Sequence, residues 1–269
     1  MGIAREGSVE ALIRGVRSGP SGPGVAALFD LDRTLIDGYS AIAFFTHRLR
    51  SGRMAAGEIA SSLAAAAAFR LGRIGFTAFL SATTAAARGL PEAALRELGE
   101  EVFERSLAAR IFPEARRLVE AHRQRGHFLA IVTSATRYQV EPIARHLGIE
   151  FVACSGLEVR NGLFTGRVRH PVCYGPGKLD AARRFASRHG FELARTRFYS
   201  DSHEDLPLLE AVGDPHPVNP TRELAETAAE RRWPTHVFAP PPGPIRRLLD
   251  DVDARWLTPG RRSARPEAA

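Results

Sequence analysis

The chain has 269 residues, of which 44% are hydrophobic and 25% charged, and a formal net charge of +7. This length and apolar content suffice to bury the core of one large domain, or of a domain that carries an insertion. No apolar run approaches the roughly 20 residues needed to cross a bilayer, and the first residues lack the pattern of a secretory signal. We therefore expect no membrane span and a cytoplasmic location.

The basic residues are 36 arginines and a single lysine, Lys178. Basic chains can bind nucleic acid by neutralising its phosphates. Here the arginines are spread along the chain beside acidic residues without a continuous basic run, so we expect no nucleic-acid partner. The two cysteines, Cys154 and Cys173, are too few for a disulfide framework or a zinc knuckle, which agrees with a reducing compartment.

The first third of the chain predicts a helix, a strand and a helical insertion. Residues 9–16 have the pattern of a short amphipathic helix, and the Gly/Pro run 19–24 ends it. The apolar run 25–29 predicts a strand buried on both faces, directly before Asp30. Residues 40–110 are rich in alanine and helical in pattern, with no strand signal, and predict an all-α insertion.

Strand and helix patterns alternate after Phe112, which predicts a parallel sheet covered by helices on both faces. Asn161-Gly162 between extended flanks is the strongest short signal for a β-hairpin, over residues 158–168. A last helical face precedes a Pro/Arg/Ala-rich tail. The expected strands are 128–133, 151–154, 196–200 and 235–238, and the expected helices are 113–122, 138–147, 178–189, 206–212 and 222–231.

Acidic side chains gather where two predicted strands end. Asp30 and Asp32 follow the first strand, and Asp201 and Asp205 follow the strand 196–200. Right-handed crossovers place the carboxyl ends of such strands, Thr133 included, at one edge of the sheet, where ligands bind. Carboxylates brought close together repel one another unless a cation or a proton transfer uses them. The pattern predicts a Mg²⁺ site with Asp30, Asp32, Asp201 and Asp205 as candidate ligands.

Two further segments supply groups for an anion. Thr133 and Ser134 offer hydroxyl and backbone N–H groups at a strand end. Lys178, preceded by Gly175-Pro-Gly177, stands at a predicted helix N-terminus, where the helix dipole also favours anions. An acidic metal site beside a cation and a hydroxyl meets the needs of phosphoryl transfer.

These four segments resemble the motifs of the haloacid dehalogenase-like superfamily. The matching residues are Asp30-x-Asp32-x-Thr34, Thr133, Lys178 and Asp201-x-x-x-Asp205, and the flanking residues are similar to its phosphoserine-phosphatase-like subfamily IB. The resemblance implies a Rossmann-like three-layer α/β/α core with an inserted all-α C1 cap. The expected divisions are an N-terminal extension (1–24), the core (25–39 and 111–240), the cap (40–110), a C-terminal helix (241–258) and a disordered tail (259–269).

The resemblance also implies roles for these residues. Asp30 would be the nucleophile that forms an aspartyl-phosphate, and Asp32 would protonate the leaving group and activate water. Asp30 and Asp201, with the backbone carbonyl of Asp32, would hold Mg²⁺. Thr133 and Lys178 would bind the phosphate, and Asp205 would orient the lysine or the waters on the metal.

Three positions depart from the phosphoserine phosphatases. Tyr39 stands nine residues after Asp30, where those enzymes have a glutamate that recognises the amino group of phosphoserine. Glu204 replaces an asparagine, and Arg33 replaces a small residue common among relatives. Phosphoserine is therefore not the expected substrate.

The sequence predicts a Mg²⁺-dependent phosphatase for a small phosphorylated metabolite. Two alternatives stay open: a phosphotransferase that uses the same aspartyl-phosphate, and a non-catalytic arginine-rich protein that binds nucleic acid or a protein partner. The sequence does not determine the oligomeric state.

Overall fold

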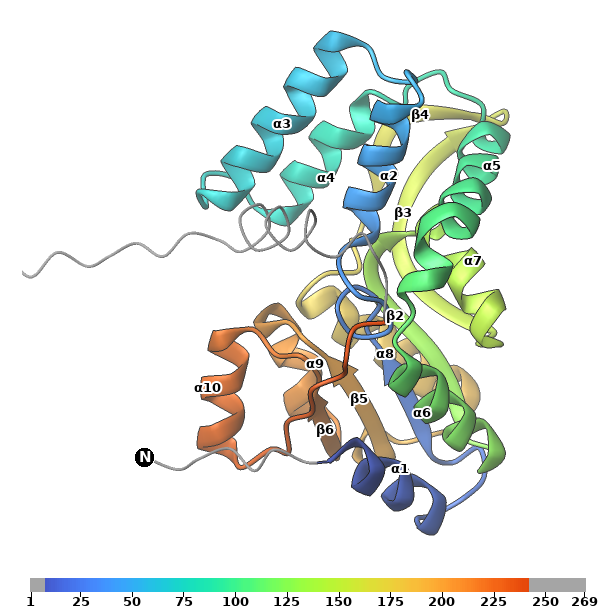
Figure 1. The fold of residues 1–269 in the computed structure, drawn as a ribbon, viewed down its shortest axis with the longest axis vertical. Coiled ribbons are helices and arrows are strands. Elements are labelled where there is room, and N and C mark those ends of the chain that lie inside the picture. The colour runs from blue at the N-terminus through green and yellow to red at the C-terminus, as the bar shows by residue number, and fades with distance from the viewer. Residues whose placement is uncertain (1–7, 242–269) are drawn as a thin grey trace, which may run out of the picture.

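The computed structural model describes residues 8–241 (Figure 1). The predicted helix over 241–258, apart from its first residue, and the predicted tail over 259–269 lie outside the described residues. Within the described range, no helix is both long and apolar enough to cross a membrane. Six strands form one sheet in the order β4-β3-β2-β1-β5-β6. They are β1 (Ala26–Phe29), β2 (Phe128–Thr136), β3 (Phe151–Arg160), β4 (Leu163–Arg169), β5 (Thr196–Ser200) and β6 (Asp214–Pro217).

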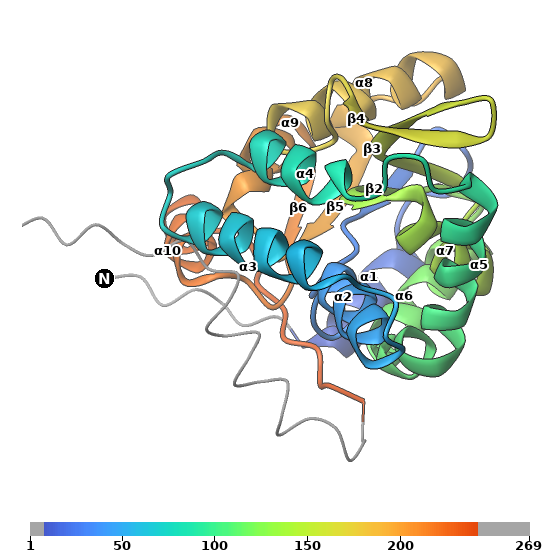
Figure 2. The same ribbon diagram turned by 90° about the horizontal axis from the view of Figure 1, so that it is seen from above.

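Helices cover both faces of this sheet, which confirms the predicted three-layer, Rossmann-like α/β fold. In β1, Ala27 and Phe29 face a cluster that includes α1 and α6, whereas Ala26 and Leu28 face a cluster that includes α8 and α9. Figure 2 shows these two pairs of helices on opposite sides of the strands. The helices of the core are α1 (Val9–Ser18), α6 (Pro113–Gln124), α7 (Arg137–Leu147), α8 (Pro176–His189), α9 (Leu206–Ala211) and α10 (Arg222–Arg231).

The sheet is mixed, which corrects the expectation of a parallel sheet in one detail. Strand β4 runs antiparallel to β3, while the remaining neighbours are parallel. The reversal comes from the predicted hairpin, in which Asn161 and Gly162 have φ values of 51° and 76°. Positive φ at both central residues is the requirement of a type I′ turn.

The prediction of the last strand was wrong. Residues 235–238 contribute only an isolated bridge between Val218 and His236, and the edge strand is β6 instead. Strand β6 has the sequence Asp-Pro-His-Pro, which lacks an apolar run. Prolines cannot donate hydrogen bonds to a neighbouring strand, so they are found on edge strands such as this one.

Residues 40–110 form four α-helices followed by two short helical turns, with no strand, as predicted. The α-helices are α2 (Ser40–Arg50), α3 (Ala56–Arg70), α4 (Phe76–Ala85) and α5 (Glu92–Val102). Figure 1 shows α2, α3 and α4 beyond the carboxyl ends of the strands of the core. Helix α5 packs instead on α7, and a Cβ at Gly99 would stand 2.3 Å from the carbonyl oxygen of Tyr138.

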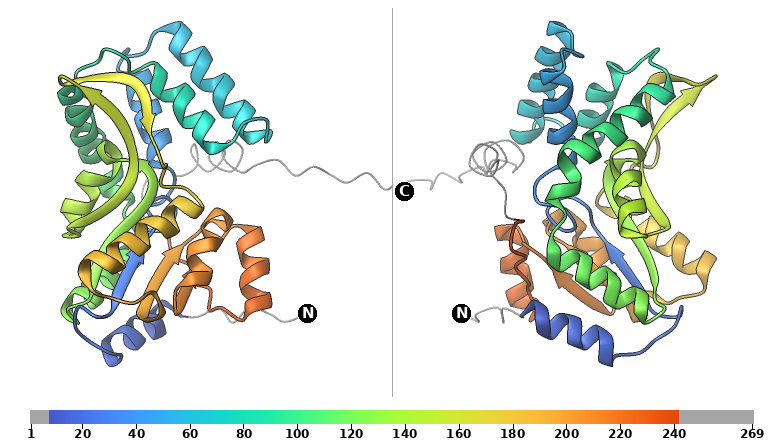
Figure 3. Two further views of the ribbon diagram at one scale, coloured as in Figure 1. Left: turned by 180° about the vertical axis from the view of Figure 1, so that it is seen from behind. Right: turned by 45° about the vertical axis from the view of Figure 1, so that its right-hand side comes forward.

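The β3–β4 hairpin extends from the sheet to the helical insertion (Figure 3). Backbone hydrogen bonds join its tip to the segment between α4 and α5. The amide of Gly89 donates to the carbonyl of Phe164 at 2.8 Å, the amide of Phe164 donates to Leu90 at 3.0 Å, and the amide of Glu92 donates to Gly162 at 2.8 Å. The insertion is therefore joined to the core through the hairpin as well as through its two chain connections.

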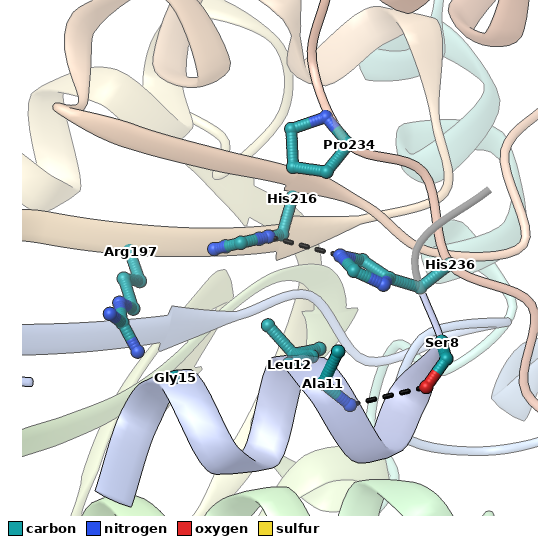
Figure 4. A pocket seen from close by; sticks show the side chains of 8 residues that line it. All are labelled: Ser8, Ala11, Leu12, Gly15, Arg197, His216, Pro234 and His236. Carbon is teal, nitrogen blue, oxygen red and sulfur yellow. Dashed lines mark hydrogen bonds between the residues drawn. The ribbon is translucent and has the colours of Figure 1, made fainter. Parts of the chain in front are cut away.

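Histidines form a buried polar network between the sheet and the helices α1 and α6. The ring of His122, which is fully buried, lies 2.9 Å from the hydroxyl of Tyr199 and 2.7 Å from the ring of His127. The ring of His216 is stacked on that of Tyr199, and a ring nitrogen of His216 lies 3.1 Å from one of His236. Figure 4 shows this last pair beside α1. A cavity of about 260 Å³ lies between α1 and these histidines. The cavity is lined by Ser8, Ala11, Leu12, Gly15, Arg197, His216, Pro234 and His236.

Burial lowers the pKa of His122 well below its usual value of 6.5, so this side chain is neutral in the folded protein. The unfolded chain takes up a proton at this position below pH 6.5 and the folded chain does not. The free energy of unfolding therefore falls as the pH is lowered through 6.5.

The wild-type protein loses unfolding free energy between pH 7.5 and pH 5.5. We predict that this loss is about 1 kcal/mol smaller in His122→Gln, because the variant lacks the buried neutral imidazole. Urea unfolding at several pH values measures the difference between the two proteins. The exposed His170 provides the control, because His170→Gln should retain the wild-type pH dependence. An unchanged pH dependence in His122→Gln would contradict the assignment.

Candidate active site

The parallel register brings the predicted strand ends together. Phe29 of β1 is paired with Ile131 of β2 and with Tyr199 of β5. The next residues, among them Asp30 and Asp201, therefore follow at one edge of the sheet, and the amide of Asp30 donates to the carbonyl of Tyr199 at 2.9 Å. Asp30 and Asp201 are 6% and 5% exposed, so both carboxylates are almost completely removed from water.

Lys178 lies at the centre of this site and binds two carboxylates. Its Nζ donates to Oδ1 of Asp30 at 2.6 Å and to Oδ2 of Asp205 at 2.7 Å. The hydroxyl of Ser200 donates to the same oxygen of Asp205 at 2.5 Å. Lys178 and Asp205 are 3% and 1% exposed. Three predicted site residues from distant parts of the chain thus form one buried network.

The position of Lys178 depends on a tight turn at the start of α8. Gly175 has a φ of 52°, and Pro176 begins the helix. A Cβ at Gly177 would stand 2.0 Å from the carbonyl oxygen of Val172, so only glycine allows this approach. The turn sets Lys178 on the third residue of the helix, where its side chain reaches the sheet edge.

Asp32 faces the first helix of the insertion. Its Oδ1 accepts a hydrogen bond from the amide of Ser40 at 2.8 Å, and its Oδ2 accepts one from the hydroxyl of Ser40 at 3.3 Å. Gln139 of α7 donates to the hydroxyl of Ser40 at 3.3 Å. This carboxylate therefore stabilises the N-terminus of α2, where an acceptor satisfies an amide left without a helical partner.

Arg33 forms an ion pair with Asp201. Its Nε donates to Oδ2 of Asp201 at 2.9 Å, and its Nη2 donates to the carbonyl of Asn219 at 3.3 Å. The backbone of Arg33 has a φ of 59°, and its carbonyl accepts a hydrogen bond from the side chain of Asn219 at 2.9 Å. A small residue is common at position 33 among relatives. Here Arg33 places its guanidinium group against Asp201, which is a candidate metal ligand.

Thr133 and Ser134 lie on β2 beyond the level of Phe29. Thr133 is 1% exposed, and its hydroxyl accepts a hydrogen bond from the amide of Ala135 at 3.1 Å. Ser134 is half-buried. Strand β2 continues to Thr136, three residues past the predicted end, so both residues lie within the strand.

Glu204 and Tyr174 connect the site to the insertion. Glu204 accepts a hydrogen bond from the hydroxyl of Ser202, and it is also paired with the Tyr174 hydroxyl, where burial and this carboxylate raise the pKa of Tyr174. The ring of Tyr174 is stacked on Phe76 of α4, with centroids 4.3 Å apart and planes at 10°. Phe76 belongs to an aromatic cluster with Phe69 and Phe79.

The buried charges perturb one another strongly. Burial, together with the charges of Asp205 and Asp32, raises the pKa of Asp30 to about 7 despite the opposing effect of Lys178. Burial and the charge of Asp30 raise the pKa of Asp201 well above its usual value. Burial alone would lower the pKa of Lys178, but Asp205 and Asp30 outweigh it and raise that pKa. The network is a concentrated negative site that holds one internal cation.

The donor set fits Mg²⁺. The charge of Asp30 disfavours ionisation of Asp201, and a divalent cation between the two carboxylates would remove this repulsion. As the side chains are placed, no three His, Cys, Asp or Glu residues in 8–241 form a metal cluster; Lys178 contacts Asp30, and Arg33 contacts Asp201. Oδ2 of Asp205 is held by Lys178 and Ser200, which favours its expected role in orienting the lysine.

Four residues that contact the site were not assigned a role in it from the sequence. Ser40 donates to Asp32, and Ser200 donates to Asp205. Arg33 pairs with Asp201, and Tyr174 pairs with Glu204. Only Ser40 carried a signal, because serine is a favoured residue where a helix begins. The other contacts join residues whose proximity arises only in the folded chain.

The fold and the site together define a Rossmann-like α/β core with acidic residues just beyond the carboxyl ends of its strands. The model of the haloacid dehalogenase-like hydrolase family matches residues 27–210, and the chain belongs to this family. The predicted family and the predicted hydrolase class are confirmed.

Relatives and a solved structure agree with this family. The chain is 34% identical over 237 residues to the inhibition of morphological differentiation protein of Streptomyces azureus, covering 86% of this chain and 84% of that protein. It is 32% identical over 233 residues to a phosphoserine phosphatase of Mycobacterium tuberculosis, covering 79% and 70%. A crystal structure of a Bordetella pertussis protein of unknown function matches with a TM-score of 0.73 and 27% identity, covering 78% and 97%.

We predict that Gly177→Ala destabilises the protein by about 1–3 kcal/mol, because the new Cβ would overlap the carbonyl of Val172 and the start of α8 would have to move. Gly57 is the matched control: it is also the second residue of a helix, but nothing lies within 4 Å of a Cβ there. Gly57→Ala should be neutral or slightly stabilising. Thermal unfolding compares the two, and equal melting temperatures would contradict the prediction.

Proposed function

We propose that the protein is a Mg²⁺-dependent phosphatase that hydrolyses a small phosphomonoester through an aspartyl-phosphate on Asp30. The observation that carries this proposal is the buried contact of Lys178 with Asp30 beside Asp201. A carboxylate attacks a phosphate dianion only when positive charge offsets their repulsion. Lys178 supplies one such charge at the nucleophile itself.

The neighbouring residues divide the remaining tasks. Asp30 and Asp201, with the backbone carbonyl of Asp32, would hold Mg²⁺, which supplies charge that neutralises the phosphate oxygens. Thr133, Ser134 and Lys178 would bind the phosphate group at the end of β2 and the start of α8. Asp205 would keep Lys178 ionised and in place through its 2.7 Å contact.

Asp32 is suited to proton transfer in this scheme. It follows the nucleophile by two residues, and Ser40 holds its carboxylate by two hydrogen bonds. Asp32 would donate a proton to the leaving oxygen and then accept one from the water that hydrolyses the aspartyl-phosphate. Its contact with the first residue of α2 also links this proton transfer to the position of the insertion.

We further propose that the insertion over 40–110 acts as a cap above the core formed by 25–39 and 111–240. The stack of Phe76 on Tyr174 supports this role, because it brings α4 onto the loop that precedes Lys178. A cap in this position would exclude water while the aspartyl-phosphate forms and until the cleaved leaving group diffuses away. The cap would also provide the contacts that select the substrate.

The substrate is proposed only as a class, a small phosphorylated metabolite. The name of the mycobacterial relative points to phosphoserine. In this chain the half-buried Tyr39 stands where a glutamate would bind the amino group of phosphoserine. A tyrosine hydroxyl cannot provide the negative charge that such a group requires, so phosphoserine is disfavoured.

A direct test is the hydrolysis of p-nitrophenyl phosphate with added Mg²⁺ and with EDTA. We expect EDTA to abolish turnover and Asp30→Asn to lower kcat at least 100-fold, because an amide cannot act as the nucleophile. Asp180→Asn, at an exposed position on α8, is the control and should retain wild-type activity. Turnover by Asp30→Asn at the wild-type rate would contradict the assignment of Asp30 as the nucleophile.

The role of the aromatic contact can be tested separately. We predict that Phe76→Ala raises KM about 3- to 10-fold, because an aromatic pair contributes about 0.5–1.5 kcal/mol and here stabilises the closed position of the cap. Phe79→Ala removes a ring of the same cluster that makes no stack with Tyr174, and it should have a smaller effect. Equal increases in KM for both variants would contradict a specific role of the Phe76–Tyr174 stack and would show that the effect comes from packing within the cap.

A further inference from the structure

The outer side of the cap has an unusual combination of exposed apolar residues and arginines without carboxylate partners. Helix α3 contains no charged residue between Glu58 and Arg70. A helix that is apolar on all sides is normally buried, yet only Ala65 of α3 is buried. Ala56, Ala60, Leu63, Ala64, Ala67 and, just past the helix end, Leu71 are exposed at helical spacing and form one stripe, with exposed Gly57 and Ser61 beside it.

Large apolar side chains extend this stripe at the ends of the cap helices. Leu71, in the turn between α3 and α4, is 60% exposed, and Leu63 is 41% exposed. Leu49 at the end of α2 and Leu90 after α4 are exposed to similar degrees. Isolated exposed leucines are common on protein surfaces, but Leu63 and Leu71 belong to the exposed stripe of α3 itself, whereas Leu90 lies in the segment bonded to the β3–β4 hairpin.

Arginines lie next to these leucines and lack counter-ions. Residues 40–90 contain six arginines and one acidic residue, Glu58. Glu58 is paired with Arg48, and Arg53 is paired with Glu101 of α5. Within residues 8–241, no carboxylate lies at ion-pair distance from Arg50, Arg70, Arg73 or Arg88.

The hairpin of α3 and α4 distributes these charges at its two ends. Arg70 and Arg73 flank the turn that joins the two helices, while Arg50 precedes α3 and Arg88 follows α4 at the opposite end. Figure 1 shows α3 at the outer limit of the molecule, with α4 between it and the β3–β4 hairpin. The apolar stripe of α3 therefore runs between two basic ends over a length of about 22 Å.

We propose that this outer cap surface, the α3 stripe with its flanking leucines and arginines, binds the surface of an anionic phospholipid membrane. Interfacial binding of this kind combines shallow burial of apolar side chains with attraction between arginines and acidic headgroups. A second copy of the chain fits less well, because a symmetric contact would bring two sets of unpaired guanidinium groups together. The proposal concerns the outer side of the cap and does not depend on the catalytic roles proposed above.

Co-sedimentation of the full chain with vesicles tests the proposal. We expect binding to vesicles of phosphatidylcholine with about one third phosphatidylglycerol, little binding to phosphatidylcholine alone, and release in 0.5 M salt, roughly where the Debye length falls to a few ångströms. The double variant Arg70→Glu/Arg73→Glu and the double variant Leu63→Ser/Leu71→Ser should each bind at least tenfold more weakly. Circular dichroism establishes that the variants fold.

The matched control changes the same number of charges on the core. Arg184 and Arg188 are exposed on α8 and have no ion pair in the described chain, so Arg184→Glu/Arg188→Glu should bind vesicles like the wild type. Equal loss in this control would show a general charge effect and overturn the proposal. Absence of wild-type binding would also overturn it, as would a dimer in light scattering that Leu63→Ser/Leu71→Ser dissociates while vesicles stay unbound.

Discussion

The buried contact of Lys178 with Asp30 and Asp205 is the constraint on which the rest of the site depends. A lysine and two carboxyl groups almost completely removed from water are stable only when each has a close partner of opposite charge or a hydrogen bond. This requirement constrains how β1, β5 and α8 are placed, because Asp30 directly follows β1, Asp205 lies in the segment after β5 and Lys178 is on α8. The turn at Gly175 and the glycine at 177 follow from it, since they allow α8 to begin close enough for the lysine to reach the sheet.

This contact explains why the chain has a lysine, and not another arginine, at position 178. Within residues 8–241 arginines form most of the ion pairs, that of Arg33 with Asp201 included, whereas the position between Asp30 and Asp205 has an ammonium group. An ammonium is compact and directs three donors around one atom, whereas a guanidinium is a planar fork that must lie in the plane of its partners. A group between two carboxylates and an incoming phosphate has to donate in three directions.

Much of the fold and of the site was predictable from the sequence. The apolar runs 25–29 and 128–132 end at Asp30 and Thr133, and the shorter strand pattern 196–200 ends just before Asp201, so these three residues could be assigned to one edge. The Asn161-Gly162 turn was equally clear, because few residues adopt positive φ twice in succession. Strand β6 could not be found, since its pairing to β5 shows only in backbone geometry and its two prolines oppose a strand assignment.

Contacts between residues far apart in the chain were also beyond prediction. Arg33 pairs with a carboxylate 168 positions away, and Tyr174 stacks on a ring of the insertion. The first pair depends on how the segments after β1 and β5 lie beside each other, and the second on how the insertion sits on the core; no local sequence pattern encodes either arrangement. The electrostatic coupling of Asp30 and Asp201 could be anticipated qualitatively from paired carboxylates, but its strength depends on the complete burial that the structure shows.

The hydrogen bonds between the β3–β4 hairpin and the segment after α4 have a mechanical consequence. They restrain the far end of the insertion, and α5 is fixed against α7, so residues 89–110 belong to the frame of the molecule and not to its moving part. Any motion of the proposed cap would then reside in α2, α3 and α4, and α2 begins at Ser40, which is bonded to Asp32. The moving part would be residues 40–88, most of the 40–110 segment, and Asp32, the carboxylate proposed to transfer protons, would contact it where it begins.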